Sequence, residues 1–100
     1  MNIDIICVGK IKEKYLKAAI DEYSKRLSRF VKLSIIEIPD EKIPDNASLK
    51  EEELIKEKEG QKILSKVSGF VVAMCIEGKE LSSTEIADTL DTIAMNNSRI

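Results

Sequence analysis

The sequence predicts an α/β fold in which a mostly parallel sheet carries helices on both faces, in the order βαβαβα. Strand-like and helix-like segments alternate along the 100 residues. The segment Phe70–Ile76 is continuously apolar, which is typical of a central parallel strand buried on both faces. Because parallel strands are joined by right-handed crossovers, the intervening helices are expected to cover both faces of the sheet.

The first half of the chain predicts a strand, a helix and a second strand. Residues 2–8 are rich in Ile and are followed by Gly9, as expected for a strand that ends at Val8. A helix over about 13–30 follows, because apolar residues recur there at spacings of three and four. These apolar positions are Leu16, Ile20, Tyr23, Leu27 and Phe30. Residues 31–38 predict the second strand, which Pro39 ends.

Capping patterns predict where the next two helices begin. The pattern that starts at Ser48 predicts a helix over about 49–67, whose charged first half is expected to face solvent. A second pattern, from Ser82 to Glu85, predicts a helix over about 83–95. Each helix is therefore expected to start at a serine whose side chain accepts a backbone hydrogen bond.

The last two residues, Arg99 and Ile100, are expected to begin a fourth strand. We therefore expect residues 1–100 to form a single domain that is the first part of a larger α/β enzyme. Open α/β sheets build their ligand sites from loops at the carboxyl ends of several strands. Such a chain is expected to carry only part of its active site.

The composition excludes several chemistries. With no histidine, residues 1–100 cannot supply histidine acid/base catalysis, a Ser-His-Asp triad or a zinc–histidine site, and we predict no metal site. Cys7 and Cys75 lie in predicted strands and are expected to be reduced thiols of a cytoplasmic protein. The longest apolar run, Phe70–Ile76, is too short to span a membrane.

Charge is distributed unevenly. Residues 1–36 hold eight Lys and Arg against four acidic residues, a net +4, whereas residues 37–100 hold eight against fourteen, a net −6. A basic first third could contact a polyanion. From charge alone we favour an ordinary solvated helix surface, because nucleic-acid-binding domains are usually more basic overall.

Two short segments are candidate binding sites by position. The turn at Glu77 and Gly78 follows the most apolar strand, where α/β ligand sites form, and glycine permits close approach of a ligand; an ordinary turn is the alternative. Lys10 and Lys12 follow the first strand and could contact phosphate groups at the same sheet edge, or simply face solvent. Because no earlier glycine precedes Gly9 and Ile11 follows Lys10, a phosphate-binding P-loop is excluded.

The combined segments resemble the N-terminal part of the large-subunit ribosomal RNA methyltransferase H family, which belongs to the SPOUT superfamily. The resemblance covers the whole chain, in order. The segments that carry it are Val8–Leu16, Glu22–Leu27, Ile35–Ile38, Glu57–Gly60 and Ile76–Ser83.

The resemblance implies a fold with a C-terminal trefoil knot, which residues 1–100 lack. It implies a cytoplasmic homodimer that binds S-adenosyl-L-methionine (SAM) and methylates N3 of a pseudouridine in 23S rRNA of the assembled ribosome. By this resemblance, Met74, Ile76 and Gly78 are expected to bind the cofactor, and Lys10 and Lys12 to contact RNA. It identifies no catalytic residue within residues 1–100.

Because the knotted segment is absent, we expect residues 1–100 alone to be inactive and to bind SAM weakly or not at all. The alternative is a non-enzymatic module that binds RNA or a protein through its basic helix. A generic nucleotide-binding α/β domain is disfavoured, since the sequence has no glycine-rich phosphate loop.

Overall fold

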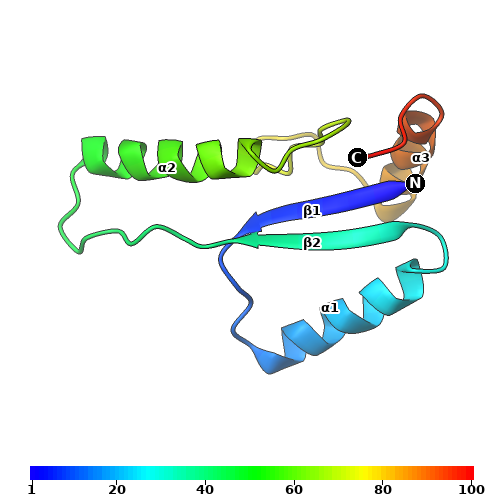
Figure 1. Cartoon of the computed structure of the whole chain (residues 1–100), viewed down its shortest axis with the longest axis horizontal. Coiled ribbons are helices and arrows are strands. Elements are labelled where there is room, and N and C mark those ends of the chain that lie inside the picture. The colour runs from blue at the N-terminus through cyan, green and yellow to red at the C-terminus, as the bar shows by residue number, and fades with distance from the viewer.

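A computed structural model describes all residues, 1–100, and shows two parallel strands flanked by helices (Figure 1). The elements are β1 (Asn2–Val8), α1 (Lys14–Leu27), β2 (Lys32–Ile38), α2 (Leu49–Leu64) and α3 (Ser83–Ala94). In Figure 1, α1 lies below the two strands and α2 lies above them. The structure therefore confirms a small α/β fold with a parallel sheet.

Strand β1 is paired along both of its edges. Its register with β2 runs in parallel from Asn2 opposite Lys32 to Val8 opposite Ile38. On the other edge, the Asn2 N–H donates to the Ser98 carbonyl at 3.0 Å, and the Asp4 N–H donates to the Ile100 carbonyl at 2.8 Å.

The strand start expected at Arg99 and Ile100 is thus present as a short parallel bridge to β1. An ion pair between the side chains of Arg99 and Asp4, at 2.6 Å, reinforces this pairing. The C-terminal residues of the chain therefore lie beside its N-terminal strand.

The prediction of a buried central strand over Phe70–Ile76 is wrong in this structure. Only Phe70 is paired, through its N–H to the Arg99 carbonyl at 3.0 Å. Side chains of the segment are exposed, with Met74 at 87% and Ile76 at 100%. The physical reason is that no segment within residues 1–100 lies alongside the backbone beyond Phe70 as a parallel partner.

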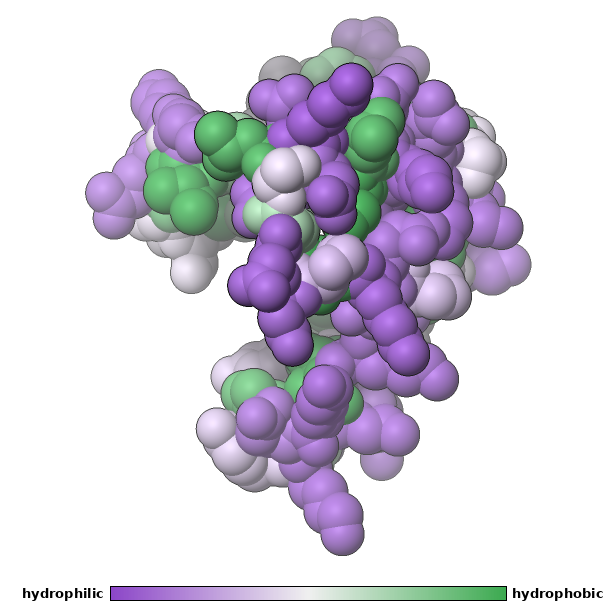
Figure 2. All heavy atoms as spheres, turned by 90° about the vertical axis from the view of Figure 1, so that its left-hand side faces the viewer, coloured by the Kyte–Doolittle hydropathy of each residue, from purple (hydrophilic) through white to green (hydrophobic).

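The apolar core is correspondingly small. Ile38, at 3% exposure, is the single buried residue of the chain. The radius of gyration is 15.9 Å, whereas a compact domain of this length has about 13 Å. Figure 2 shows apolar side chains at the surface between the charged ones. Most of the apolar surface that the sequence supplies is therefore available to a further layer of protein.

The helix boundaries follow the predicted signals closely at the start and less closely at the end. Helices α1 and α2 end three residues earlier than expected, because their last residues form tighter turns. The Phe30 N–H donates to the Leu27 carbonyl, and the Val67 N–H donates to the Leu64 carbonyl, both three residues back. As expected, the first half of α2 faces solvent, with Leu49 at 80% exposure.

Helix α3 begins with the reciprocal capping box that the sequence predicts. The Ser82 Oγ accepts from the Glu85 N–H at 3.2 Å, and the Glu85 carboxylate accepts from the Ser82 N–H at 3.3 Å. At α2 only the serine half of the box is complete, from the Glu51 N–H to the Ser48 Oγ at 3.2 Å.

We expect Ser82→Ala to destabilise α3 by about 1 kcal/mol, because the substitution leaves a helix N-terminal N–H without its partner. Amide hydrogen exchange in the first turn of α3 measures the effect. Ser83→Ala is the matched control, since the Ser83 hydroxyl makes no hydrogen bond and the residue is already inside the helix. Equal exchange in both variants would contradict a capping role for Ser82.

The loop between β2 and α2 is held to α2 by one ion pair. Lys62 Nζ lies 2.8 Å from Glu41 Oε1. The hydrogen bond from Lys62, together with the charge of that ammonium, lowers the pKa of Glu41 from its ordinary value of 4.5. Since the folded-state pKa is lowered, this contribution to stability is present above the ordinary pKa and is lost as the pH falls through the lowered value.

Candidate functional site

The carboxyl ends of β1 and β2 form the sheet edge at which the sequence places a ligand site. The Gly9 N–H donates to the Ile38 carbonyl at 2.7 Å, which extends the strand pairing by one residue. Gly9 has a φ of +84°, a conformation that favours glycine, so the chain can turn sharply out of the sheet there. Lys10 and Lys12 follow in the exposed connection to α1, and neither forms an ion pair.

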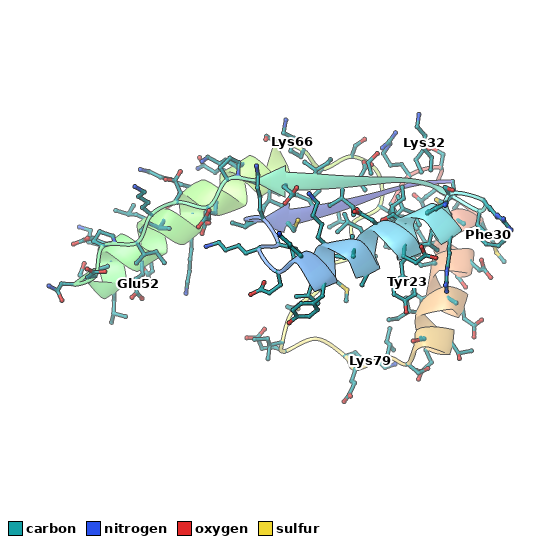
Figure 3. All side chains as sticks on the ribbon, turned by 90° about the horizontal axis from the view of Figure 1, so that it is seen from below. Tyr23, Phe30, Lys32, Glu52, Lys66 and Lys79 are labelled. Atoms are coloured by element: carbon teal, nitrogen blue, oxygen red, sulfur yellow. The ribbon has the colours of Figure 1, made fainter.

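Met74, Ile76 and Gly78 lie on the long connection between α2 and α3. A turn closes there, in which the Gly78 N–H donates to the Cys75 carbonyl at 3.0 Å. A Cβ on Gly78 would lie 3.1 Å from that carbonyl oxygen, so the turn is tight against the Gly78 backbone. Figure 3 shows Lys79, the next residue, on a loop that projects away from the strands.

The backbone of this segment has unused hydrogen-bonding capacity. None of the N–H groups from Val71 to Glu77 donates a hydrogen bond within the chain. Exposed apolar side chains and free N–H groups therefore lie together along one segment. These groups can contact the apolar and polar parts of a bound small molecule, or pair with another strand.

The predicted RNA-binding lysines and the predicted cofactor-binding residues do not contact each other through hydrogen bonds or ion pairs in this structure. No hydrogen bond or ion pair links Lys10 or Lys12 to the segment that carries Met74, Ile76 and Gly78. Neither of the two main surface hollows is lined by any of these five residues. Neither hollow therefore joins the predicted lysines to the predicted cofactor-binding residues in this structure.

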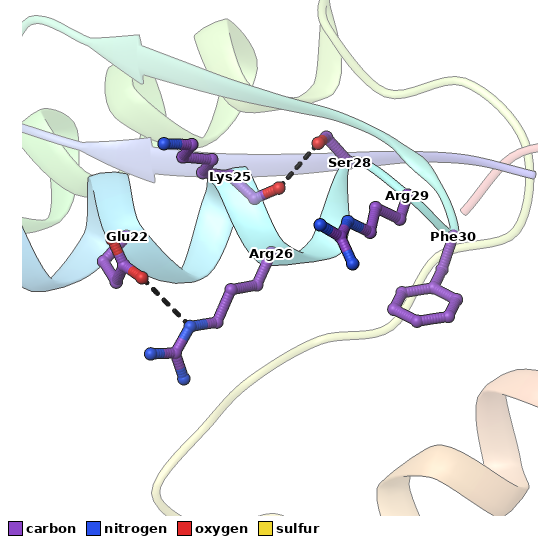
Figure 4. Close-up of a pocket in the computed structure, with 6 residues that line it drawn as sticks. All are labelled: Glu22, Lys25, Arg26, Ser28, Arg29 and Phe30. Carbon is purple, nitrogen blue, oxygen red and sulfur yellow. Dashed lines mark hydrogen bonds and ion pairs between the residues drawn. The ribbon is translucent and has the colours of Figure 1, made fainter.

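The structure also shows a group of residues that the sequence analysis did not single out. Where α1 ends, the side chains of Lys25, Arg26 and Arg29 line an open hollow together with the exposed ring of Phe30 (Figure 4). The helical periodicity assigned Phe30 to the core stripe, but the ring is 78% exposed. The signal that could have revealed the group is the density of Lys and Arg on both sides of Phe30 in the sequence.

Metal ligands and membrane-spanning helices give no further candidate. No three His, Cys, Asp or Glu side chains are grouped so that they could hold a metal ion. None of the helices combines the length and the apolar character needed to cross a membrane. Cys7 and Cys75 are both free thiols, Cys7 half-buried and Cys75 exposed.

Comparison with known proteins gives consistent similarities. A family model described as "Predicted SPOUT methyltransferase" matches residues 1–100. The chain is 63% identical over 93 residues to a ribosomal RNA large subunit methyltransferase H of Clostridium botulinum (strain 657 / Type Ba4). The aligned region covers 91% of this chain and 58% of that protein. Proteins of the same name in Clostridium beijerinckii and Clostridioides difficile are 62% and 58% identical over 97 residues, covering 95% of this chain and 61% of each.

Proposed function

The chain belongs to the SPOUT methyltransferase family, and from this premise we propose that it takes part in SAM-dependent methylation of N3 of a pseudouridine in 23S rRNA. The observation that carries the proposal is the family match over residues 1–100, together with relatives named for methylation of large-subunit rRNA. The chain spans 58–61% of the length of these relatives, so the activity is proposed for a protein of their full length. The alternative of a non-enzymatic binding module is not favoured by these similarities.

We further propose that Met74, Ile76 and Gly78 hold SAM. When bound, SAM supplies an electrophilic methyl group on a sulfonium. The exposed side chains of Met74 and Ile76 offer apolar contact area, and the tight turn at Gly78 lets a ligand approach the backbone closely. Since neither of the two main hollows is lined by these residues, we expect residues 1–100 alone to bind SAM weakly or not at all.

Lys10 and Lys12 are proposed to contact phosphates of the RNA. Both are exposed, and neither is engaged in an ion pair. Lysine contacts to phosphates hold a nucleic acid in place without reading its sequence. The same proposal includes a cytoplasmic homodimer that acts on the assembled ribosome.

A chimera tests the proposed function. Residues 1–100 are joined to the remaining part of the Clostridium beijerinckii relative, and the product is incubated with radiolabelled SAM and ribosomes. We expect the chimera to methylate 23S rRNA at a pseudouridine and residues 1–100 alone to transfer no methyl group, because transfer requires both reactants held in near-attack geometry. A folded chimera without activity would contradict the proposed function, and transfer by residues 1–100 alone would contradict the incomplete site.

Within the active chimera, Met74→Asp tests the proposed SAM site. The substitution replaces apolar contact area with a charge that the ligand must desolvate, so we expect the dissociation constant for SAM to rise by about tenfold or more. Isothermal titration calorimetry measures it. Met95→Asp is the matched control, since Met95 is also exposed, at 80%, and lies at the end of α3. Equal SAM affinity in the two variants would show that Met74 does not contact SAM.

A further inference from the structure

Basic side chains and one exposed aromatic ring line the surface where α1 ends and β2 begins. Two open hollows, of about 470 Å³ and about 440 Å³, meet there and share Phe30 in their lining. We call this group the α1–β2 corner. It consists of Lys25, Arg26, Arg29, Phe30 and Lys32.

The positive charge of the α1–β2 corner is only partly neutralised by acidic side chains. The one carboxylate that lines either hollow is that of Glu22, whose Oε1 lies 3.0 Å from Arg26 Nε. Lys25, Arg29 and Lys32 have no carboxylate within ion-pair distance. Three cationic groups are therefore available to neutralise an incoming anion.

Hydrogen bonds to backbone carbonyl groups fix the shape of the corner. The Ser28 Oγ donates to the Lys25 carbonyl at 2.6 Å, and the Phe30 N–H donates to the Leu27 carbonyl at 2.9 Å. The Lys32 N–H donates to the Met1 carbonyl at 3.0 Å, which ties the corner to β1. Because the backbone is already ordered, a ligand would have to immobilise only the side chains of the corner.

The chemistry of the corner matches a single-stranded nucleic acid. Phe30 is the one apolar residue among the six that line the larger hollow, and three of the others are the basic residues Lys25, Arg26 and Arg29. A single strand alternates charged phosphates with flat bases, and exposed aromatic rings bind such bases by stacking. Close by, the guanidinium of Arg26 lies 5.9 Å from the ring centre of Tyr23, which adds a second aromatic surface.

We propose that the α1–β2 corner binds single-stranded RNA, with Phe30 stacking on a base and the cations of Lys25, Arg29 and Lys32 contacting phosphates. This proposal rests on the proposed function, which makes RNA the substrate. The corner lies at the amino end of β2, whereas Lys10 lies beyond the carboxyl end of β1. Seven residues of strand separate the two ends by about 20 Å, so the corner is a second contact region for the RNA.

Binding of a labelled oligouridylate of about 12 nucleotides, measured by fluorescence anisotropy, tests the proposal. The test variant combines Lys25→Ala, Arg29→Ala and Lys32→Ala. We expect it to bind about tenfold more weakly or worse, and the slope of log affinity against log salt to fall by about 2, since each lost phosphate contact removes roughly 0.7. The matched control removes three exposed cations of α2, through Lys50→Ala, Lys56→Ala and Lys58→Ala, and should change affinity less than twofold.

Two substitutions at Phe30 separate stacking from simple charge attraction. Phe30→Trp keeps a flat ring and should retain binding, whereas Phe30→Leu keeps apolar volume without the ring and should weaken binding about tenfold. Circular dichroism checks that each variant folds. Equal binding by Phe30→Leu and the wild type would overturn the proposal, as would displacement of the RNA by a polyglutamate of matched charge.

A Lys10→Ala, Lys12→Ala variant separates this proposal from the proposed function. If only that variant loses RNA binding, the proposal that the α1–β2 corner binds RNA is overturned, while the proposed RNA contacts of Lys10 and Lys12 are supported. If only the corner variant loses binding, the corner is supported and the contacts of Lys10 and Lys12 are contradicted. Methyl transfer by the chimera is measured independently of either result.

Discussion

At concentrations on the order of micromolar, the isolated chain is expected to self-associate through the exposed, unpaired backbone of Val71–Ile76, which we call the 71–76 edge although it is not a strand here, and Val72→Lys is expected to return it towards a monomer. The N–H groups of this edge donate no hydrogen bond within the chain, and its side chains are exposed. An apolar strand edge with free N–H and C=O groups is a template for pairing with a second chain. A lysine on the edge opposes such pairing because the charge would have to be desolvated.

Sedimentation velocity measures this association directly. We expect Val72→Lys to raise the dissociation constant at least about tenfold. Leu49→Lys is the matched control, since it makes the same kind of change at an 80% exposed position of α2, away from the edge. A chain that stays monomeric at the highest attainable concentration, or equal effects of the two lysines, would show that the edge does not drive association.

Association through the edge also distinguishes the isolated chain from the chimera. In the chimera, the additional residues can pair with Val71–Ile76, so the edge would be covered within one molecule. We therefore expect Val72→Lys to destabilise the chimera while it makes the isolated chain more soluble. Opposite effects of one substitution in the two contexts would identify the same edge in both.

Local signals predicted the elements whose formation depends on neighbouring residues in the sequence. The capping box at Ser82 and the break at Pro39 are examples, because a cap or a break is decided within a few residues. Burial could not be predicted in the same way. Phe70–Ile76 has the sequence of a central strand, yet it lacks a partner beyond Phe70 and stays exposed.

At the candidate site, too, burial could not be predicted from the local sequence. Helical spacing placed Phe30 on the apolar face of the helix predicted over about 13–30, but spacing identifies a face and not what packs against it, and the ring is exposed. The assignment of Met74 came from resemblance to a family, whereas Gly78 and Lys10 were also candidates by their position after predicted strands; all three stay predictions. The α1–β2 corner became visible only in the structure, where Phe30 and the basic residues near it line the same hollows.

Gly69 and Gly60 are expected to respond to alanine in opposite directions. Gly69 has a φ of +84°, and a Cβ there would lie 2.3 Å from the carbonyl oxygen of Arg99. That oxygen accepts the Phe70 N–H, the one bond that holds the 70–76 segment to the sheet. Gly69→Ala must therefore both strain the backbone and push Arg99 away, which should lower the free energy of unfolding by about 2–3 kcal/mol.

Gly60 is the matched control because it lies inside α2 and a Cβ there would meet no atom within 4 Å. Gly60→Ala should raise the free energy of unfolding by about 1 kcal/mol, since alanine is the better helix former. Chemical denaturation of the Val72→Lys background, which limits association, measures both variants. Destabilisation by both alanines would point to a general intolerance of substitution and not to the contact with Arg99.

Gly69→Ala should also weaken SAM binding, although Gly69 is not one of the residues of the proposed SAM site. Gly69 fixes where the segment carrying Met74, Ile76 and Gly78 leaves the sheet, through the bond between Phe70 and Arg99. In the chimera, we therefore expect Gly69→Ala to weaken SAM binding, while Gly60→Ala leaves it unchanged. Unchanged affinity in a folded Gly69→Ala chimera would mean that the position of this segment is set by other contacts, and that the Phe70–Arg99 bond is not what orients the site.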